Sequence, residues 1–107
     1  MDIYYIYILA SRHHNYISIT VTAELEDAIR IHRNRINHRL GRSQVFQKLV
    51  YVEAVRGAET ALGRQRQLRK FSFEKIAQLI ELVNPCWEGI SLSALSKSGY
   101  SRIRALL

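Results

Sequence analysis

The sequence contains a single cysteine, a single proline and no long apolar run. Cys86 alone cannot form an intramolecular disulfide or a cysteine-based zinc site, so we expect a reducing, cytoplasmic setting. The apolar run over residues 3–10 is far shorter than the roughly 18 residues of a membrane span, and no small-residue cleavage site follows it. The sequence therefore predicts neither a transmembrane helix nor a signal peptide, and we expect no membrane partner.

Acidic residues are also few. The chain carries 9 Asp and Glu against 16 Lys and Arg, a formal net charge of +7 at pH 7. The surplus is concentrated between Arg30 and Lys75, and most of it is arginine, whose planar fork suits phosphate. We therefore expect nucleic acid, in the first place DNA, or another polyanion as the partner. A solvated basic surface without a partner fits the same charge count and stays open.

Apolar residues, in contrast, are abundant. Hydrophobic residues make up 48% of the 107 residues, which excludes a disordered chain and is enough for one core. We expect one domain over residues 1–90. Residues 91–107 form a Ser-rich extension with a weak amphipathic pattern that is compatible with a helix.

The periodicity of the apolar residues predicts the elements. The segment over residues 3–10 is rich in aromatic and β-branched residues, as in a buried strand. The segment over residues 16–22 alternates between apolar and polar residues with period two, as in a second strand. We expect the two strands to form a hairpin. Residues 25–32 have helical spacing, 48–55 form a third strand, 58–70 a helix, and Ser72 begins a last helix that ends at Asn84 and Pro85. The order β-β-α-β-α-α predicts an α+β domain, with a small three-stranded antiparallel sheet flanked by helices.

Four segments in this order resemble the GIY-YIG nuclease family, and together they cover most of residues 3–90. They are Tyr5-Ile6-Tyr7-Ile8-Leu9 as the first tyrosine motif, Leu25 to His32 as the first helix, Leu49-Val50-Tyr51-Val52-Glu53 as the central strand, and Gln67-Leu68-Arg69-Lys70-Phe71-Ser72 with Asn84-Pro85-x-Trp87 as the C-terminal signature. Tyr5 stands where the first motif has glycine. The resemblance implies a GIY-YIG-like fold.

The resemblance also implies a chemistry. Phosphodiester hydrolysis needs a base for the attacking water, cations on the phosphate and a metal ion. The family supplies a tyrosine in each tyrosine motif, an arginine and a histidine on the first helix, and a metal-binding glutamate on a later helix. Tyr7 and His32 match the first tyrosine and the histidine, and they are the candidate catalytic residues, although both residue types also occur as ordinary packing residues.

The other family positions are degenerate. Ser18 and Thr20 replace the tyrosine and glycine of the second motif, although an alternative register places Tyr16-Ile17-Ser18 there with two extra residues before the helix. Asp27 replaces the arginine, and a reversed charge 4 Å from a phosphate is worth several kcal/mol, roughly 4, at an effective dielectric of about 20. Gln65 replaces the glutamate, and a neutral amide is a poor sole ligand for Mg²⁺. We therefore assign no metal ligand and expect no cofactor.

The remaining functional feature is the basic surface. Its candidate nucleic-acid-binding residues follow the first helix or lie on the second: Arg33, Arg35, Arg39, Arg42, Arg64, Arg66, Arg69 and Lys70. Such a surface would bind phosphates without reading base sequence.

Three hypotheses follow. The first is a GIY-YIG-like domain that binds nucleic acid and has lost phosphodiester cleavage. The second is an active endonuclease with a rearranged site, for which Mg²⁺ or Mn²⁺ would be required. The third is a protein interaction module, with a homodimer formed through the leucine-rich tail.

Overall fold

Strand β1 (Ile3–Ser11) runs through the centre of the sheet, between β2 (Ile17–Thr22) and β3 (Phe46–Arg56), and both neighbours are antiparallel to it. This arrangement belongs to a computed structural model that describes residues 2–11, 14, 16–31, 46–90 and 103–105. The hairpin, the third strand and the three-stranded antiparallel sheet predicted from the sequence are confirmed. The α+β order of the chain is also as predicted.

The sheet gains a fourth strand from the C-terminal extension. Strand β4 (Ile103–Ala105) pairs in parallel with β3, and the strand order is β2-β1-β3-β4. Residues 103–105 are therefore extended, not helical, and the rest of the extension lies outside the described residues. The pairing covers part of the β3 edge, whose backbone N–H and C=O groups would otherwise be exposed.

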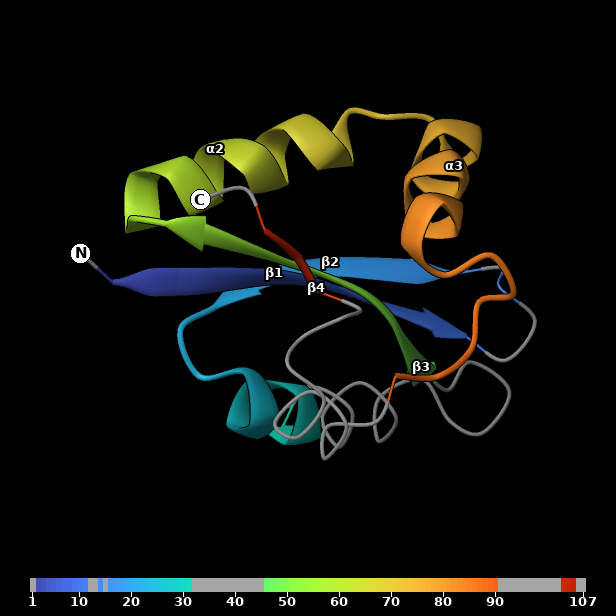
Figure 1. Cartoon of the computed structure of the whole chain (residues 1–107), viewed down its shortest axis with the longest axis horizontal. Helices are drawn as coiled ribbons and strands as arrows, with labels where there is room; N and C mark the ends of the chain where they lie inside the picture. Colours follow the sequence, from blue (N-terminus) through green and yellow to red (C-terminus); the bar gives the residue numbers. More distant parts are fainter. Residues whose placement is uncertain (1, 12–13, 15, 32–45, 91–102, 106–107) are drawn as a thin grey trace.

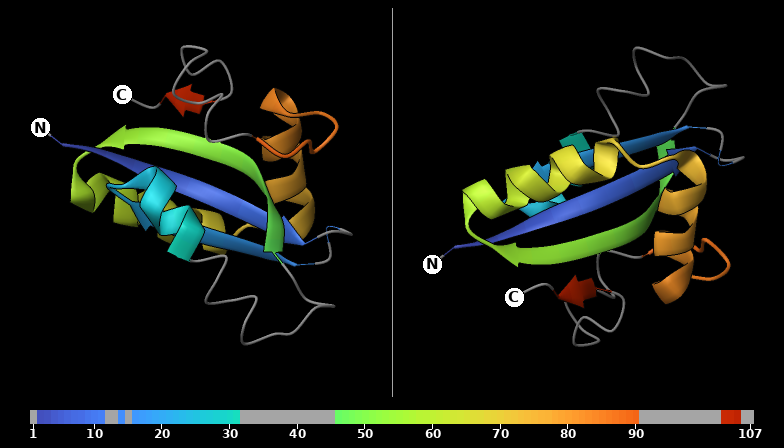
Figure 2. Two further views of the ribbon diagram at one scale, coloured as in Figure 1. Left: turned by 90° about the horizontal axis from the view of Figure 1, so that it is seen from below. Right: turned by 90° about the horizontal axis from the view of Figure 1, so that it is seen from above.

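Helices cover both faces of the sheet (Figure 1). A helix over residues 25–31 lies on one face, and α2 (Ala58–Arg69) and α3 (Phe73–Val83) lie on the other. Figure 2 shows that α2 runs along the strands, whereas α3 crosses them at one end. In the part of the chain that the structure describes, no helix has the length and apolar character that crossing a membrane requires.

Because both faces are covered, β1 is buried on both. Ile6 and Ile8 pack into the core beneath α2 and α3, and Tyr7 and Leu9 pack into a second core that contains Ile29 of the first helix. Successive side chains of a strand point to opposite faces, so a strand covered on both sides must be apolar at every position. This explains the continuous apolar run that begins the sequence.

The segment that follows α3 is hydrogen-bonded to β3 at an irregularity of that strand. The pairing with β1 skips Val50, because Ile8 lies opposite Tyr51 and Leu9 lies opposite Leu49, as in a β-bulge. The buried Asn84 donates from Nδ2 to the Val50 carbonyl at 3.0 Å and to the Glu88 carbonyl at 2.9 Å. Asn84 therefore ties the chain that follows α3 to the sheet.

The predicted ends of the last helix are confirmed. The Ser72 hydroxyl accepts a hydrogen bond from the Lys75 backbone N–H at 3.1 Å, which caps α3. Trp87, from the C-terminal signature, is buried and donates from Nε1 to the Glu81 carboxylate at 2.8 Å.

Candidate functional site

Tyr7, the family-matched tyrosine, lies in the interior. Its side chain is 1% exposed and belongs to the core beneath the helix over residues 25–31. Thr20 is its cross-strand neighbour on β2, and the two side chains are hydrogen-bonded. Burial raises the pKa of the Tyr7 phenol above its ordinary value of 10.0, and the bond to Thr20 offsets only part of that rise. Tyr7 is therefore a neutral phenol at physiological pH.

The residues of the second tyrosine motif extend this neutral polar row. Ser18 and Thr20 alternate along β2 on the face of Tyr7, and their hydroxyl oxygens are 3.4 Å apart. Tyr16, the tyrosine of the alternative register, precedes β2 and is 51% exposed. The structure thus brings Tyr7, Ser18 and Thr20 together, as three neutral hydroxyl groups.

Asp27, which the resemblance predicts at the position of the family's arginine, lies on the exposed side of the first helix. Its carboxylate forms an ion pair with Arg30 one turn later, and the two side chains are 63% and 68% exposed, respectively. The Arg30 guanidinium screens the negative charge of Asp27, but it does not replace a cation at that position. An ion pair this exposed contributes about 1 kcal/mol or less to stability.

Gln65, which the resemblance predicts at the position of the family's metal-binding glutamate, lies on α2 and faces the edge of the sheet. Its Nε2 donates to the Ile19 carbonyl at 2.9 Å, and Arg69 donates to the same oxygen from Nη2 at 3.1 Å. The side chain is a neutral amide, and one end of it is already committed to the backbone of β2. Within the described residues, no three His, Cys, Asp or Glu side chains are grouped so that they could hold a metal ion, and the neutral Gln65 amide does not fit the role of a glutamate ligand.

Several predicted site residues fall outside the described part of the chain. These are His32, Arg33, Arg35, Arg39 and Arg42. Their assignment to catalysis or to nucleic-acid binding stays a prediction.

The Arg64 side chain is bound to a buried carboxylate. Its Nε and Nη2 donate to the two carboxylate oxygens of Glu53 at 2.9 and 2.7 Å, and its Nη1 donates to Gln67 at 2.8 Å. Glu53 is fully buried on β3 and also accepts a hydrogen bond from the Tyr51 hydroxyl at 2.5 Å. The hydrogen bonds to Glu53 raise the pKa of the Arg64 guanidinium. We therefore do not count Arg64 among the exposed cations of α2.

The other predicted cations of α2 are exposed. Arg66, Arg69 and Lys70 lie at the C-terminal end of the helix, and Lys75 follows in the first turn of α3. The ion pairs found within the described residues join Asp27 to Arg30 and Glu53 to Arg64, so none of these four cations has a carboxylate partner there. Their charge is available to an anionic partner.

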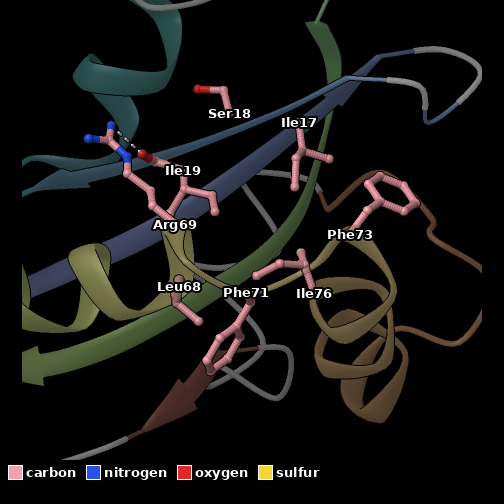
Figure 3. A pocket seen from close by; sticks show the side chains of 8 residues that line it. All are labelled: Ile17, Ser18, Ile19, Leu68, Arg69, Phe71, Phe73 and Ile76. Carbon is pink, nitrogen blue, oxygen red and sulfur yellow. Dashed lines mark hydrogen bonds between the residues drawn. The ribbon is translucent and has the colours of Figure 1, made fainter.

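A groove opens beside these cations, where the edge of β2 meets the connection between α2 and α3 (Figure 3). It has a volume of about 500 Å³. Its apolar lining comes from Ile17 and Ile19 on β2, Leu68 on α2, Phe71 in the connection, and Phe73 and Ile76 on α3. Arg69 borders the groove as its charged residue.

Sequence reasoning missed two of these features. A glutamate inside the apolar strand over residues 48–55, two positions after a tyrosine, was a signal for a buried partner, because such a charge must be paired. Phe71 and Phe73 flank Ser72, the predicted cap of the last helix. These two aromatic residues could have been assigned to a binding surface. Their meeting with Ile17 and Ile19 depends on tertiary packing, which no sequence pattern reveals.

Comparison with known proteins locates the fold. No protein-family model matches the chain, and no curated protein matches it. The structure is similar to the solution NMR structure of the UPF0213 protein BH0048 from Bacillus halodurans, with 22% sequence identity and a TM-score of 0.52. The match covers 80% of this chain and 90% of that chain. At this identity the similarity concerns the fold, and the chain has a fold like that of this UPF0213 protein.

Proposed function

We propose that this chain is a GIY-YIG-like domain that binds nucleic acid, in the first place DNA, and does not cleave it. The observation that carries the proposal is the group of exposed cations at the end of α2, formed by Arg66, Arg69 and Lys70 and continued by Lys75. Among the described residues these cations have no carboxylate partner. The GIY-YIG-like arrangement of the strands and helices and the net charge of +7 support it.

The binding would be electrostatic and independent of base sequence. Cations that neutralise phosphates release counterions, so the logarithm of the binding constant falls linearly with the logarithm of the salt concentration. With three or four neutralised phosphates, this linear dependence on salt has a modest slope. Phosphate contacts by further cations would make the slope steeper, and the candidates are Arg33, Arg35, Arg39 and Arg42.

The proposal that cleavage is lost rests on the state of the family-matched positions. A general base has to be deprotonated near the working pH, and burial disfavours the phenolate of Tyr7, because it raises the pKa of the phenol above its ordinary value of 10.0. Asp27 presents a carboxylate where the phosphate needs a cation. Gln65 uses its amide on the Ile19 carbonyl. Among the residues that the structure describes, the groups at three of the family-matched positions are therefore not suited to the roles that hydrolysis requires.

The experiment is a binding titration by fluorescence anisotropy with labelled duplex, branched and single-stranded DNA over a range of salt concentrations. We expect binding at low salt that weakens as the salt concentration rises, with a slope of about −0.9 for each neutralised phosphate. Replacing Arg66, Arg69 and Lys70 by Gln should lower the salt slope by about one for each phosphate that is no longer neutralised. Arg56→Gln is the matched control, because Arg56 is an exposed cation at the end of β3, before α2 begins.

Incubation of the same DNA with Mg²⁺ or Mn²⁺ tests the second half of the proposal. We expect no cleavage products. Cleavage that Tyr7→Phe abolishes would show that the chain is a nuclease with a rearranged site. Failure to bind any of the DNA forms at low salt would overturn the binding half and favour a protein interaction module.

A further inference from the structure

The groove between β2 and the α2–α3 connection has a partly exposed aromatic wall. Phe73 at its rim is 47% exposed, and the partly buried Phe71 lines the groove from the connection between α2 and α3. Phe73 also stacks on Trp87, with ring centroids 6.2 Å apart. The ring is therefore held in place from one side, so little conformational entropy is lost when a planar group packs against it.

Positive charge borders this aromatic wall. The Lys75 ammonium lies 4.1 Å from the centroid of the Phe71 ring, and Arg69 lines the side of the groove next to β2. Arg69 uses Nη2 on the Ile19 carbonyl, and a guanidinium has five N–H donors. None of the residues that line the groove is acidic. The charge therefore fits an anionic ligand.

The opposite wall supplies backbone hydrogen-bonding groups. β2 is an edge strand, and the Ile19 carbonyl points away from β1, because it accepts from the side chains of α2. Along an antiparallel strand, the backbone N–H and C=O groups of successive residues point alternately toward and away from the neighbouring strand. Ile17 lies two residues before Ile19, so its N–H and C=O also point away from β1. In Figure 3 the Ser18 side chain points away from the apolar side chains of the groove, so its hydroxyl does not take part.

A ligand that matches this site is planar and apolar on its faces, polar at its edge and attached to a phosphate. We propose that the groove binds an unpaired nucleobase and that the chain therefore prefers single-stranded or locally unpaired nucleic acid. A base in a duplex is covered by its neighbours on both faces, so only an unpaired base can enter. This inference rests on the proposed nucleic-acid binding and names the form of nucleic acid that this binding favours.

The test compares two labelled strands of equal charge and length, an oligothymidylate of about twelve nucleotides and the same backbone without bases. We expect the full-length chain to bind the oligothymidylate about tenfold more tightly, because stacking of one base contributes a factor of about 5 to 100. Phe73→Ala should remove this difference and leave the affinity for the abasic strand unchanged. Phe73→Trp should keep the difference, because it keeps an aromatic face.

Leu82→Ala is the matched control, because Leu82 is an apolar side chain on α3 that is 72% exposed and does not line the groove. It should keep the wild-type difference between the two strands. Equal affinity of the wild type for both strands would overturn the inference while the nucleic-acid proposal stands, and a groove for a protein side chain would then be the better interpretation. If the chain binds neither strand at low salt but does bind duplex or branched DNA, the inference fails and the proposed function stands. If it binds none of these DNA forms, both proposals fail. Because the wild-type comparison decides these outcomes, they do not depend on whether Phe73→Ala folds.

Discussion

Two buried tyrosines on opposite faces of the sheet have contrasting surroundings. Tyr51 lies beneath α2 and α3, where its hydroxyl donates to the buried carboxylate of Glu53, which Arg64 also binds. Tyr7 lies beneath the helix over residues 25–31, where its partner is the neutral hydroxyl of Thr20. One tyrosine belongs to a charged network and the other to a row of neutral groups.

The difference shows how charge is distributed in this domain. Among the described residues, the buried charged side chain is that of Glu53, which lies on the opposite face of the sheet from Tyr7. The α2 side carries both the buried ion pair and the exposed cations that follow it along the helix. Binding of phosphate is therefore proposed for α2 and the start of α3, whereas Tyr7 has become part of a core. Substitutions on the two faces test this contrast, and the loss of Arg64 should have the greatest consequence.

Removing Arg64 should destabilise the protein most. Arg64→Met leaves the fully buried Glu53 carboxylate without its cation, and breaking a buried pair in this way costs about 3–5 kcal/mol. We expect the lower end of this range, because the Arg64 side chain is 18% exposed and water can approach the site. Denaturant unfolding should show a lower midpoint with an unchanged slope.

The double variant Glu53→Gln with Arg64→Met is the control for this change. Since it buries no charge, it should be more stable than Arg64→Met alone. A double variant less stable than the single one would mean that Glu53 is held by other groups and that the ion pair is not what stabilises α2.

The two tyrosine hydroxyls should differ in their effect on stability. Tyr51→Phe removes a hydrogen bond to a charged group, which is worth about 1.5–3 kcal/mol, whereas Tyr7→Phe removes one between neutral hydroxyls, worth about 0.5–1.5 kcal/mol. Each variant is its counterpart's control, since both delete one buried phenol oxygen. Equal losses in denaturant unfolding would contradict the contrast between the two faces.

The exposed ion pair of the first helix should contribute less to stability than the two tyrosine hydroxyls do. Asp27→Asn removes the carboxylate that pairs with Arg30, and exposed pairs contribute about 0.2–1 kcal/mol. The loss should disappear at high salt, because salt screens exposed charges. A loss that persists in high salt would indicate that Asp27 has a structural role that its exposure does not suggest.

The titration of Tyr7 should have no effect on stability at neutral pH. Its pKa in the folded protein is raised above 10.0 by burial, so the folded state keeps a proton that the unfolded state releases. Its contribution is fully present below pH 10 and is lost as the pH rises from about 10 through the folded pKa. In a spectrophotometric titration, Tyr7→Phe should remove a phenolate signal that appears above the ordinary tyrosine range. A titration unchanged by this substitution would contradict the burial of Tyr7.

Much of the fold could be predicted because its signals are local. The alternation in residues 17–22, the apolar run of β1 and the Ser72 cap each depend on neighbours a few residues away, and each predicted the right element. β4 could not be predicted, because three residues of a Ser-rich tail become a strand only when the edge of β3 is there to pair with. The bulge at Val50 likewise depends on the pairing with β1 and on Asn84, more than thirty residues later.

The candidate site divides in the same way. The amino-acid types alone predict which chemical groups occupy the positions that match the family, with Asp27 at the place of the arginine and Gln65 at the place of the glutamate. They also establish that positive charge is concentrated after the first 29 residues. The folded chain was needed to show that Arg64 is bound to Glu53 while Arg66, Arg69 and Lys70 are exposed. It was also needed to bring Phe73 to the same groove as Ile17, because contacts between residues distant in sequence are made by packing, and packing is a property of the whole fold.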